Sequence, residues 1–520
     1  MNNLSMNNLS MNNLSMNSLP KRIDTPLRSV AEIRTLETAL FSLQDSYTVM
    51  QTAAQGLFDV ISRDVLTNTP ADLPAVSQTV HILLGAGNNA GDGLVLGGLL
   101  VQANINVIAY TIFDCLFHGD AQKAYQFAIE SGLTIRPFSP FHCAEKDIIV
   151  EAIFGIGLDR PITGLARSAV EYANHCKSTY PAITVYAVDV PAGIIADTGA
   201  SVGTALYADT TITFIADKIG LHTADGRASA GRIVVKDLGA ATLPEYPCPY
   251  PSDCSYSCYS YQHTASPPYL NTHKGNYGHA LIVGGGQGMF GAAALASVSA
   301  LKVGTGKASI YSHPDYVTQY HLEATPIYEV MRCLSLNDVT PYSSVVLGTG
   351  LGRGSWGKTT FEQTVNSLAN QALLIDADGL WHLAQKAVDK QQLPAVAVIT
   401  PHEAEAARLL AVSVEAIRAD KPQAARQLAQ RYRTIAVLKG AGTVISDGQS
   451  LWFNTTGNSY LATAGTGDVL AGIIGGYLAQ GYPPLDAALY GVYRHGLAAD
   501  DYRQTHADKS LRAGDLWDFL

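Results

Sequence analysis

The sequence predicts an α/β protein of two domains, each with a mostly parallel sheet that helices cover on both faces. The chain has 520 residues, of which 47% are hydrophobic and 15% charged, and this length exceeds what one hydrophobic core usually supports. Short apolar runs alternate with helical patterns along most of the chain, as expected for strand–helix–strand units. The 47 glycines cluster in short turns after such runs, where α/β proteins place their ligand sites.

The N-terminus and the overall charge argue against several classes of protein. Residues 1–21 carry a polar five-residue repeat, "MNNLS", without the basic and apolar segments of a signal peptide, and we expect a disordered extension. A net charge of −10 favours neither nucleic acid nor an anionic membrane, and no run reaches the ~18 apolar residues of a membrane span. Seven cysteines, an odd number, favour a reducing cytoplasm over a disulfide scaffold. We expect a cytoplasmic protein whose partners are small molecules, and we also expect a homo-oligomer.

The first domain is expected over residues 22–243. Ser29 and Glu32 form a capping-box pattern at the start of a helical region with apolar residues three and four apart. Strands are predicted at 79–84, 105–112, 147–155, 183–193 and 210–216, with helices between them, for example at 119–132 and 166–176. This order predicts a mostly parallel sheet.

A change of composition marks a linker at residues 244–268, which are rich in Pro, Tyr, Ser and Cys. Cys248, Cys254, Cys258 and His263 suggest a zinc site, but they lack the paired C-x-x-C spacing of structural sites, so a mobile surface linker is favoured. The second domain, residues 269–520, opens with "GHALIVGGGQG" and continues as a second α/β unit.

Four loops of the second domain follow predicted strands, at residues 348–354, 400–403, 439–443 and 465–468. The carboxyl ends of parallel strands meet at one edge of a sheet, so we expect these loops to converge. Gly465, Thr466 and Gly467 lead into a helix whose free N–H groups and dipole favour a phosphate. Asp468 would then lie beside a phosphoryl group, where a general base deprotonates an attacking hydroxyl.

Each of these candidates also has a structural interpretation. Asp468 alone suits a helix N-cap equally well, and the convergence of the loops is what favours catalysis. Lys439 suits a nucleotide pocket or an exposed turn, and a lone His402 is more often structural. For Asp376 and Asp378 in "LLIDADGL" we expect a role as caps of the next helix.

The richest stretch of the first domain is "LLGAGNNAGDGLV", which places Asn88, Asn89 and Asp92 in the turn between a strand and a helix. It is not the G-x-G-x-x-G dinucleotide pattern. Its side-chain oxygens suit a ribose, a phosphate or a hard cation, and the alternative is a turn stabilised by asparagines. Asp189 in "DVPAG" and the glycine loop at 155–161 should lie beside it.

Together "KGNYGHALIVGGGQGMFGAAALA", "LKGAGTVI" and "TAGTGDVLAG", with "NNAGD" before them, closely resemble the bifunctional NAD(P)H-hydrate repair enzymes from about Val30 to the end, the linker excepted. The resemblance implies a Rossmann-like NAD(P)HX epimerase domain followed by a ribokinase-like, ADP- or ATP-dependent NAD(P)HX dehydratase domain. The dehydratase would phosphorylate the added hydroxyl of S-NAD(P)HX and eliminate phosphate, with Mg²⁺ accompanying the nucleotide. The epimerase would interconvert the R and S hydrates.

The resemblance also implies the site residues. Asp468 is the implied base of the dehydratase and Asp189 the implied acid/base of the epimerase. The implied hydrate contacts of the dehydratase are Ala292, Gly352, His402 and Asp468, and its nucleotide contacts are Lys439, Gly440, Ala441, Gly442, Thr443 and Gly467. The implied substrate contacts of the epimerase are Asn88, Asn89, Ala90, Gly91, Asp92, Gly155, Ile156, Gly157, Leu158, Asp159, Arg160, Pro161 and Asp189. A K⁺ ion is implied at Asn89, Glu151 and Ala192.

The chain departs from the family pattern at a few positions. Glu151 replaces an aspartate, Ala192 a serine and Ala90 a glycine, which bears on the K⁺ site and on epimerase turnover. Changes at Thr349, Glu403 and Ala404 remove no assigned polar group. Two alternatives stay open: a small-molecule kinase of ribokinase type, which the GTGD stretch alone fits, and a dehydratase whose first domain is an inactive epimerase that only binds substrate or acts as a scaffold.

Overall fold

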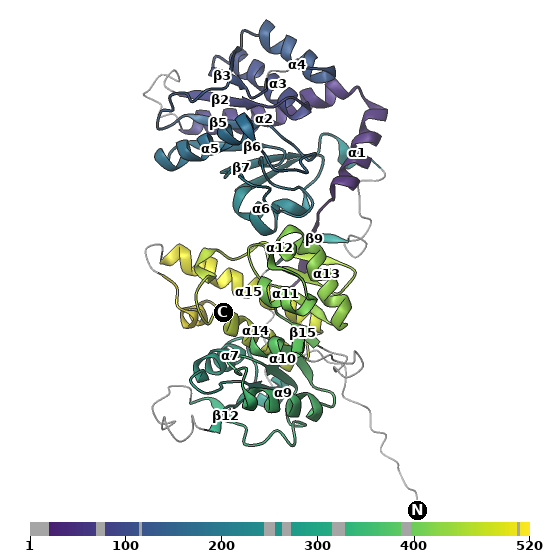
Figure 1. Cartoon of the computed structure of the whole chain (residues 1–520), viewed down its shortest axis with the longest axis vertical. Coiled ribbons are helices and arrows are strands. Elements are labelled where there is room, and N and C mark those ends of the chain that lie inside the picture. The colour runs from purple at the N-terminus through teal and green to yellow at the C-terminus, as the bar shows by residue number, and fades with distance from the viewer. Residues whose placement is uncertain are drawn as a thin grey trace, which may run out of the picture.

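The structure is a computed structural model that describes residues 20–68, 78–113, 117–243, 255–262, 272–314, 328–385, 397–506 and 510–520. It contains a 7-stranded and an 11-stranded sheet, each at the centre of its own α/β domain (Figure 1). The prediction of two α/β domains is confirmed. The N-terminal repeat lies almost wholly outside the described residues, as do Cys248, Cys254 and His263 of the proposed zinc set. No helix in the described ranges is long and apolar enough to cross a membrane.

The N-terminal domain is built on the 7-stranded sheet, in which all neighbouring strands are parallel. Its order, β4-β3-β2-β5-β6-β7-β8, means that the chain starts at β2, winds to one edge, returns to β5 beside it and winds to the other edge. The gap between the ends of β2 and β5 is thus a topological switch point, the usual place of a ligand site. The strands are β2 (Thr79–Leu84), β3 (Asn106–Thr111), β4 (Thr134–Pro137), β5 (Ile148–Ala152), β6 (Thr184–Val188), β7 (Thr210–Phe214) and β8 (Arg232–Lys236).

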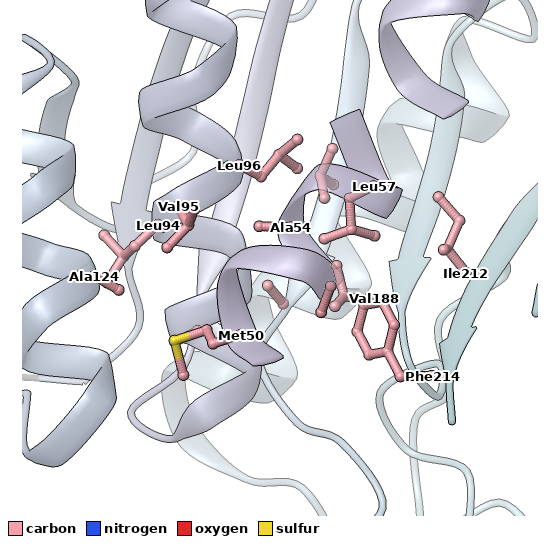
Figure 2. Packing of buried hydrophobic residues seen from close by; sticks show 14 of the residues in the cluster. Met50, Ala54, Leu57, Leu94, Val95, Leu96, Ala124, Val188, Ile212 and Phe214 are labelled. Carbon is pink, nitrogen blue, oxygen red and sulfur yellow. The ribbon is translucent and has the colours of Figure 1, made fainter. Parts of the chain in front are cut away.

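Helices cover both faces of this sheet because its strands are apolar on both sides. Ile82 of β2 faces a core shared with α1 to α4, whereas Leu83 faces the core under α5. Figure 2 shows part of the first core, where Leu57 of α2 and Leu96 of α3 lie near Val188 and other residues of the sheet. The elements are α1 (Val30–Leu43), α2 (Ser46–Asn68), α3 (Asn88–Gln102), α4 (Gly119–Glu130), α5 (Gly164–Thr179), η2 (Ile219–Leu221), α6 (Ala224–Ser229) and η3 (Ala240–Thr242).

The C-terminal domain is built on the 11-stranded sheet, in the order β1-β9-β18-β17-β16-β15-β14-β13-β10-β11-β12. Strands β10 to β16 are parallel to one another. Strand β17 pairs antiparallel with β16, and β18 pairs antiparallel with β17. The strands are β10 (His279–Val283), β11 (Lys307–Tyr311), β12 (Val330–Arg332), β13 (Ser344–Leu347), β14 (Ala372–Ile375), β15 (Ala397–Ile399), β16 (Ile435–Leu438), β17 (Val444–Ser446) and β18 (Leu451–Asn454).

Alternate side chains of these strands also bury on opposite faces. Ile282 packs with α7, α14 and α15, and Leu281 packs in the core with α9 to α13. The elements are η5 (Lys274–Tyr277), α7 (Phe290–Lys302), α9 (Ser355–Ser367), α10 (Asp378–Gln385), α11 (Glu403–Leu410), α12 (Val414–Ala419), α13 (Lys421–Tyr432), η7 (Ser459–Leu461), α14 (Thr466–Ala479), α15 (Pro484–Thr505) and η8 (Ala513–Phe519).

Two short strands change the domain boundaries expected from the sequence. Within the segment expected to be a linker, β9 (Tyr256–Tyr261) pairs in parallel with β18, and it buries Cys258. The segment at the start of the expected first domain, β1 (Arg22–Pro26), then pairs antiparallel with β9. Both strands therefore belong to the C-terminal sheet, although β1 precedes the whole N-terminal domain in the chain. Composition did not reveal this because pairing between distant segments leaves no local signal.

Helices α14 and α7 approach closely because α14 has glycine where it crosses α7. A Cβ built on Gly472 would lie 2.1 Å from the carbonyl oxygen of Ala296 on α7. Only glycine allows this separation, so the contact fixes the position of α14 against α7.

Gly472→Ala is expected to lower the free energy of unfolding by about 1–3 kcal/mol, the usual cost of overpacking a filled core. Denaturant unfolding of the full chain measures it. Gly291→Ala on α7 is the matched control, because a Cβ there meets no atom within 4 Å. Equal stability of Gly472→Ala and the unchanged protein would contradict the close helix contact.

Candidate functional site

An ion pair joins the ends of three neighbouring parallel strands in the C-terminal domain. Asp376 follows β14 and is 2% exposed. Its Oδ1 accepts hydrogen bonds from Thr400 Oγ1, after β15, and from Lys439 Nζ, after β16, both at 2.8 Å. Burial disfavours the charge on Lys439, but the carboxylates of Asp376 and Glu405 outweigh it and raise the pKa of the lysine. Lys439 is therefore a fixed positive charge at the carboxyl edge of the sheet.

Asp468 lies beside this pair without being bonded to it. A Cβ on Gly467 would lie 3.6 Å from Lys439 Nζ, so the loop before α14 reaches the same place. The carboxylate of Asp468 accepts no hydrogen bond from any residue that the structure describes. Burial, followed by the negative charge of Asp376, raises the pKa of Asp468 to about 7, although Lys439 lowers it. Such a carboxylate can accept a proton near neutral pH.

The capping role considered for Asp468 does not hold. The N-cap of α14 is Gly465, which has φ +92, and Asp468 is the third residue of the helix. The capping role expected for Asp376 and Asp378 does not hold either. Asp376 binds Thr400 and Lys439, and Asp378 accepts hydrogen bonds from Gly352 N at 2.9 Å and Arg353 Nε at 2.9 Å. Tertiary contacts use these carboxylates because the strand ends lie together.

The remaining expected loops reach the same edge. His402 caps α11, as its Nδ1 accepts a hydrogen bond from Ala404 N. Burial and then the charge of Lys439 lower the pKa of His402, which is therefore near the site. A Cβ on Gly350 would lie 3.0 Å from Ala292 Cβ, which brings α7 to the loop after β13. The four loops thus converge as predicted. Sequence reasoning named Asp376 only as a helix cap and missed its place in the site, although an acid directly after an apolar strand was a signal for it.

The N-terminal domain has a cavity of about 780 Å³ at its topological switch point. Helix α3 begins at Asn88, so "NNAGD" forms its first turn instead of the preceding loop. Asn88, Asn89 and Asp92 line the cavity, whereas Ala90 and Gly91 are buried in helix packing. The loop after β5 contributes Gly155, Ile156, Gly157, Leu158, Asp159 and Arg160, but Pro161 is not part of the lining.

Asp189 enters this cavity from the end of β6 in a strained backbone conformation, with φ +68. Its Oδ1 accepts a hydrogen bond from Thr213 Oγ1 at 3.1 Å and forms an ion pair with Lys218 Nζ at 2.8 Å. Its Oδ2 accepts no hydrogen bond from the described residues and faces Gly155. Sequence reasoning missed Lys218, which is 1% exposed. Its signal was a lysine amid the apolar residues of "FIADKIGL".

The residues expected to hold K⁺ do not offer a cation an oxygen-lined site. Ala192 has no side-chain oxygen, and its N–H donates to Glu151 Oε2 at 2.9 Å. Glu151 Oε1 accepts from Ile153 N at 2.7 Å, so backbone donors point at both carboxylate oxygens. Burial raises the pKa of Glu151 to about 7. Asn89 Nδ2 donates to the carbonyls of Phe154 and Val188. The carboxylate of Glu151 thus binds backbone N–H groups of the protein itself, and these residues do not fit K⁺.

The fold and these sites define a two-domain α/β enzyme with a candidate acid/base carboxylate at the carboxyl edge of each sheet. Residues 280–519 match a family model described as NAD(P)H-hydrate dehydratase, and residues 46–220 match one described as YjeF-related protein N-terminus. The chain belongs to the bifunctional NAD(P)H-hydrate repair enzymes.

Two relatives that cover most of the chain accord with this assignment. The bifunctional NAD(P)H-hydrate repair enzyme Nnr of Vibrio cholerae is 37% identical over 436 residues, which cover 82% of this chain and 85% of that protein. The protein of the same name from Coxiella burnetii is 32% identical, covering 95% and 99%. The structure of the ADP/ATP-dependent NAD(P)H-hydrate dehydratase of Bacillus subtilis, co-crystallised with ATP/Mg²⁺, is 31% identical with a TM-score of 0.43, covering 48% of this chain and 90% of that one.

Asp468→Asn is expected to raise the melting temperature more at pH 8 than at pH 5. The folded chain holds the Asp468 proton up to a pKa of about 7, against an ordinary value of 3.8, so folding binds a proton between these values. Stability therefore falls as the pH rises through this window, and a neutral amide removes that cost.

Thermal unfolding of both proteins at the two pH values measures the effect. Asp378→Asn is the matched control, because that carboxylate is already hydrogen-bonded to Gly352 and Arg353 and its loss should destabilise. A lower melting temperature for Asp468→Asn at pH 8 would favour a structural role for Asp468.

Proposed function

We propose that the chain repairs hydrated nicotinamide cofactors, with the C-terminal domain converting S-NAD(P)HX to NAD(P)H with ADP or ATP and the N-terminal domain interconverting the R and S hydrates. The observation that supports the first activity most strongly is the unbonded carboxylate of Asp468, whose pKa is raised to about 7 beside Lys439. A base with this pKa is half deprotonated at neutral pH and still basic enough to take a proton from a hydroxyl in the transition state.

In the proposed dehydratase reaction, Asp468 accepts the proton of the hydroxyl that hydration added to the nicotinamide ring. The oxygen then attacks the terminal phosphoryl group of the nucleotide, whose bond to the bridging oxygen breaks, so that ADP leaves from ATP or AMP leaves from ADP. Lys439 and the free N–H groups at the start of α14 stabilise the negative charge on the phosphoryl oxygens. Departure of phosphate from one ring carbon and of a proton from the next restores the double bond of NAD(P)H.

The nucleotide is assigned to the loop of Lys439, Gly440, Ala441, Gly442 and Thr443, with Gly467 facing it. Among the residues that the structure describes, no group of three or more His, Cys, Asp or Glu side chains could hold a metal ion. Mg²⁺ would be bound chiefly through the phosphates and water, and it would neutralise phosphate charge.

In the proposed epimerase reaction, Asp189 transfers the proton. Lys218 and Thr213 hold Oδ1, which leaves Oδ2 to act on the substrate. The ion pair with the lysine and the hydrogen bond from the threonine fix the direction of the carboxylate in the cavity. No K⁺ takes part, because Glu151 already binds the backbone N–H groups of Ile153 and Ala192.

Asp468→Asn should lower kcat for dehydration of S-NADHX by about 10²–10⁴-fold, the usual contribution of a general base. Nucleotide affinity should remain largely intact, since the amide keeps the size of the side chain. In the unchanged enzyme the rate should rise with pH through about 7, as Asp468 loses its proton. The rate is followed by NADH absorbance as a function of pH, and nucleotide affinity is measured by calorimetric titration with ATP. Survival of activity would remove Asp468 as the base.

The epimerase proposal predicts equal rates with K⁺ and with tetramethylammonium as the only monovalent cation. R-enriched NADHX and ATP are supplied to the full chain, and both epimers are followed by chromatography. Asp189→Asn should then consume only the S form beyond spontaneous epimerisation. Acceleration by K⁺ would contradict the proposed cation independence.

If the unchanged protein itself consumes only the S form, the N-terminal domain is the inactive binding or scaffold domain that the changes at Glu151 and Ala192 suggest. A simple kinase of ribokinase type would instead leave a stable phosphate ester and release no NADH, so the same assay separates the three functions.

A further inference from the structure

The two domains touch at the loop assigned to the nucleotide. The N–H of Ala224, at the start of α6, donates to the carbonyl of Ala441 at 3.2 Å. The hydroxyl of Thr223 donates to the carbonyl of Gly442 at 3.0 Å. Figure 1 shows α6 on the face of the N-terminal domain that is turned toward the C-terminal domain. A loop of the first domain therefore holds two consecutive peptide groups of the second.

The contact is close and specific. Gly442 has φ +55, and a Cβ there would lie 1.9 Å from the carbonyl oxygen of His222, so no larger residue fits against this backbone. Thr223 is the N-cap of α6, but its side chain makes no capping hydrogen bond. An N-cap threonine normally satisfies its own helix. Here its hydroxyl serves the other domain, and the side chain is completely buried.

The same two carbonyls are held from within the C-terminal domain. Lys421, at the start of α13, is 1% exposed, and its Nζ donates to Ala441 O at 2.9 Å and to Gly442 O at 3.3 Å. Each carbonyl thus receives one donor from each domain. A buried ammonium group needs such acceptors. Because both carbonyls bind the same Nζ atom, Lys421 alone does not fix the orientation of both peptide planes.

The direction of these carbonyls decides where the N–H groups of the loop point. The C=O and the N–H of one trans peptide group point in opposite directions. Ala224 N–H and Lys421 hold the carbonyl of Ala441, and Thr223 and Lys421 hold that of Gly442. These bonds therefore turn the N–H groups of Gly442 and Thr443 the other way. These two N–H groups donate to no residue in the described part of the chain, and successive free N–H groups form a typical anion site.

We infer that the N-terminal domain completes the nucleotide site of the C-terminal domain, with Thr223 as a positioning residue that orients the peptide group between Gly442 and Thr443 for the phosphates. This inference rests on the assignment of residues 439–443 to the nucleotide. Thr223 touches no substrate, so its role is expressed in nucleotide affinity and not in the chemical step.

The test compares three variants of the full chain. Thr223→Val keeps the shape of the side chain and removes the donor, Thr223→Ser keeps the donor, and Arg227→Ala removes a different contact between the domains. Arg227 Nη2 donates to Thr455 O at 2.8 Å and does not touch residues 439–443. Affinity for Mg–ATP is measured by calorimetry, together with kcat and the KM values for ATP and S-NADHX.

Thr223→Val should weaken ATP binding and raise its KM by about two- to tenfold, the range of one lost hydrogen bond. Its kcat and the KM for S-NADHX should stay near those of the unchanged enzyme. Thr223→Ser should restore ATP affinity, and Arg227→Ala should not alter it. If Arg227→Ala raises the KM for ATP as much as Thr223→Val does, the inference is overturned, because the effect would then come from domain docking in general.

Lys439→Met separates this inference from the proposed function. If Lys439→Met weakens ATP binding and Thr223→Val does not, the loop binds the nucleotide and only the inference is overturned. If neither variant changes ATP affinity, the nucleotide assignment fails and the inference fails with it.

Discussion

The ion pair between Lys439 and Asp376 is the contact on which the C-terminal site depends. It ties the ends of β14 and β16 together across β15, with Thr400 as a second donor to the same carboxylate oxygen. Asp376 pairs with the charged Lys439. Its negative charge, together with burial, also raises the pKa of Asp468. One interaction thus holds three strand ends in register and leaves a neighbouring carboxylate with a pKa suited to proton transfer.

The N-terminal site also contains a buried lysine paired with an aspartate, but in a different arrangement. There the candidate acid/base, Asp189, is itself the partner of the buried lysine, and one of its two oxygens stays available to the cavity. Its positive φ stores strain that the surrounding bonds to Thr213 and Lys218 maintain. The nearby carboxylate of Glu151 accepts hydrogen bonds from two backbone N–H groups, so it is part of the protein's own hydrogen bonding.

The two domains are joined more extensively than a linker requires. Strand β1 precedes the N-terminal domain but completes the edge of the C-terminal sheet through β9, so the chain crosses between the domains twice. The contact of Thr223 and Ala224 with Ala441 and Gly442 lies a few residues after Lys218 of the N-terminal site. The two sites are consequently connected through a short, buried segment, which gives the fusion of the domains a physical consequence.

The sequence by itself determined the two α/β units, the capping box of Ser29 and Glu32, and the convergence of four loops, because strand–helix alternation and strand-end glycines are local patterns. Its motifs also led to the right family. Only the tertiary structure decided that Asp376 binds Lys439 instead of capping α10, that Asp468 is unbonded, that Lys218 pairs with Asp189, and that β1 and β9 belong to the second sheet. These features depend on residues far apart in the chain, and the burial that shifts the pKa of Asp468 arises only when the strands and helices pack together.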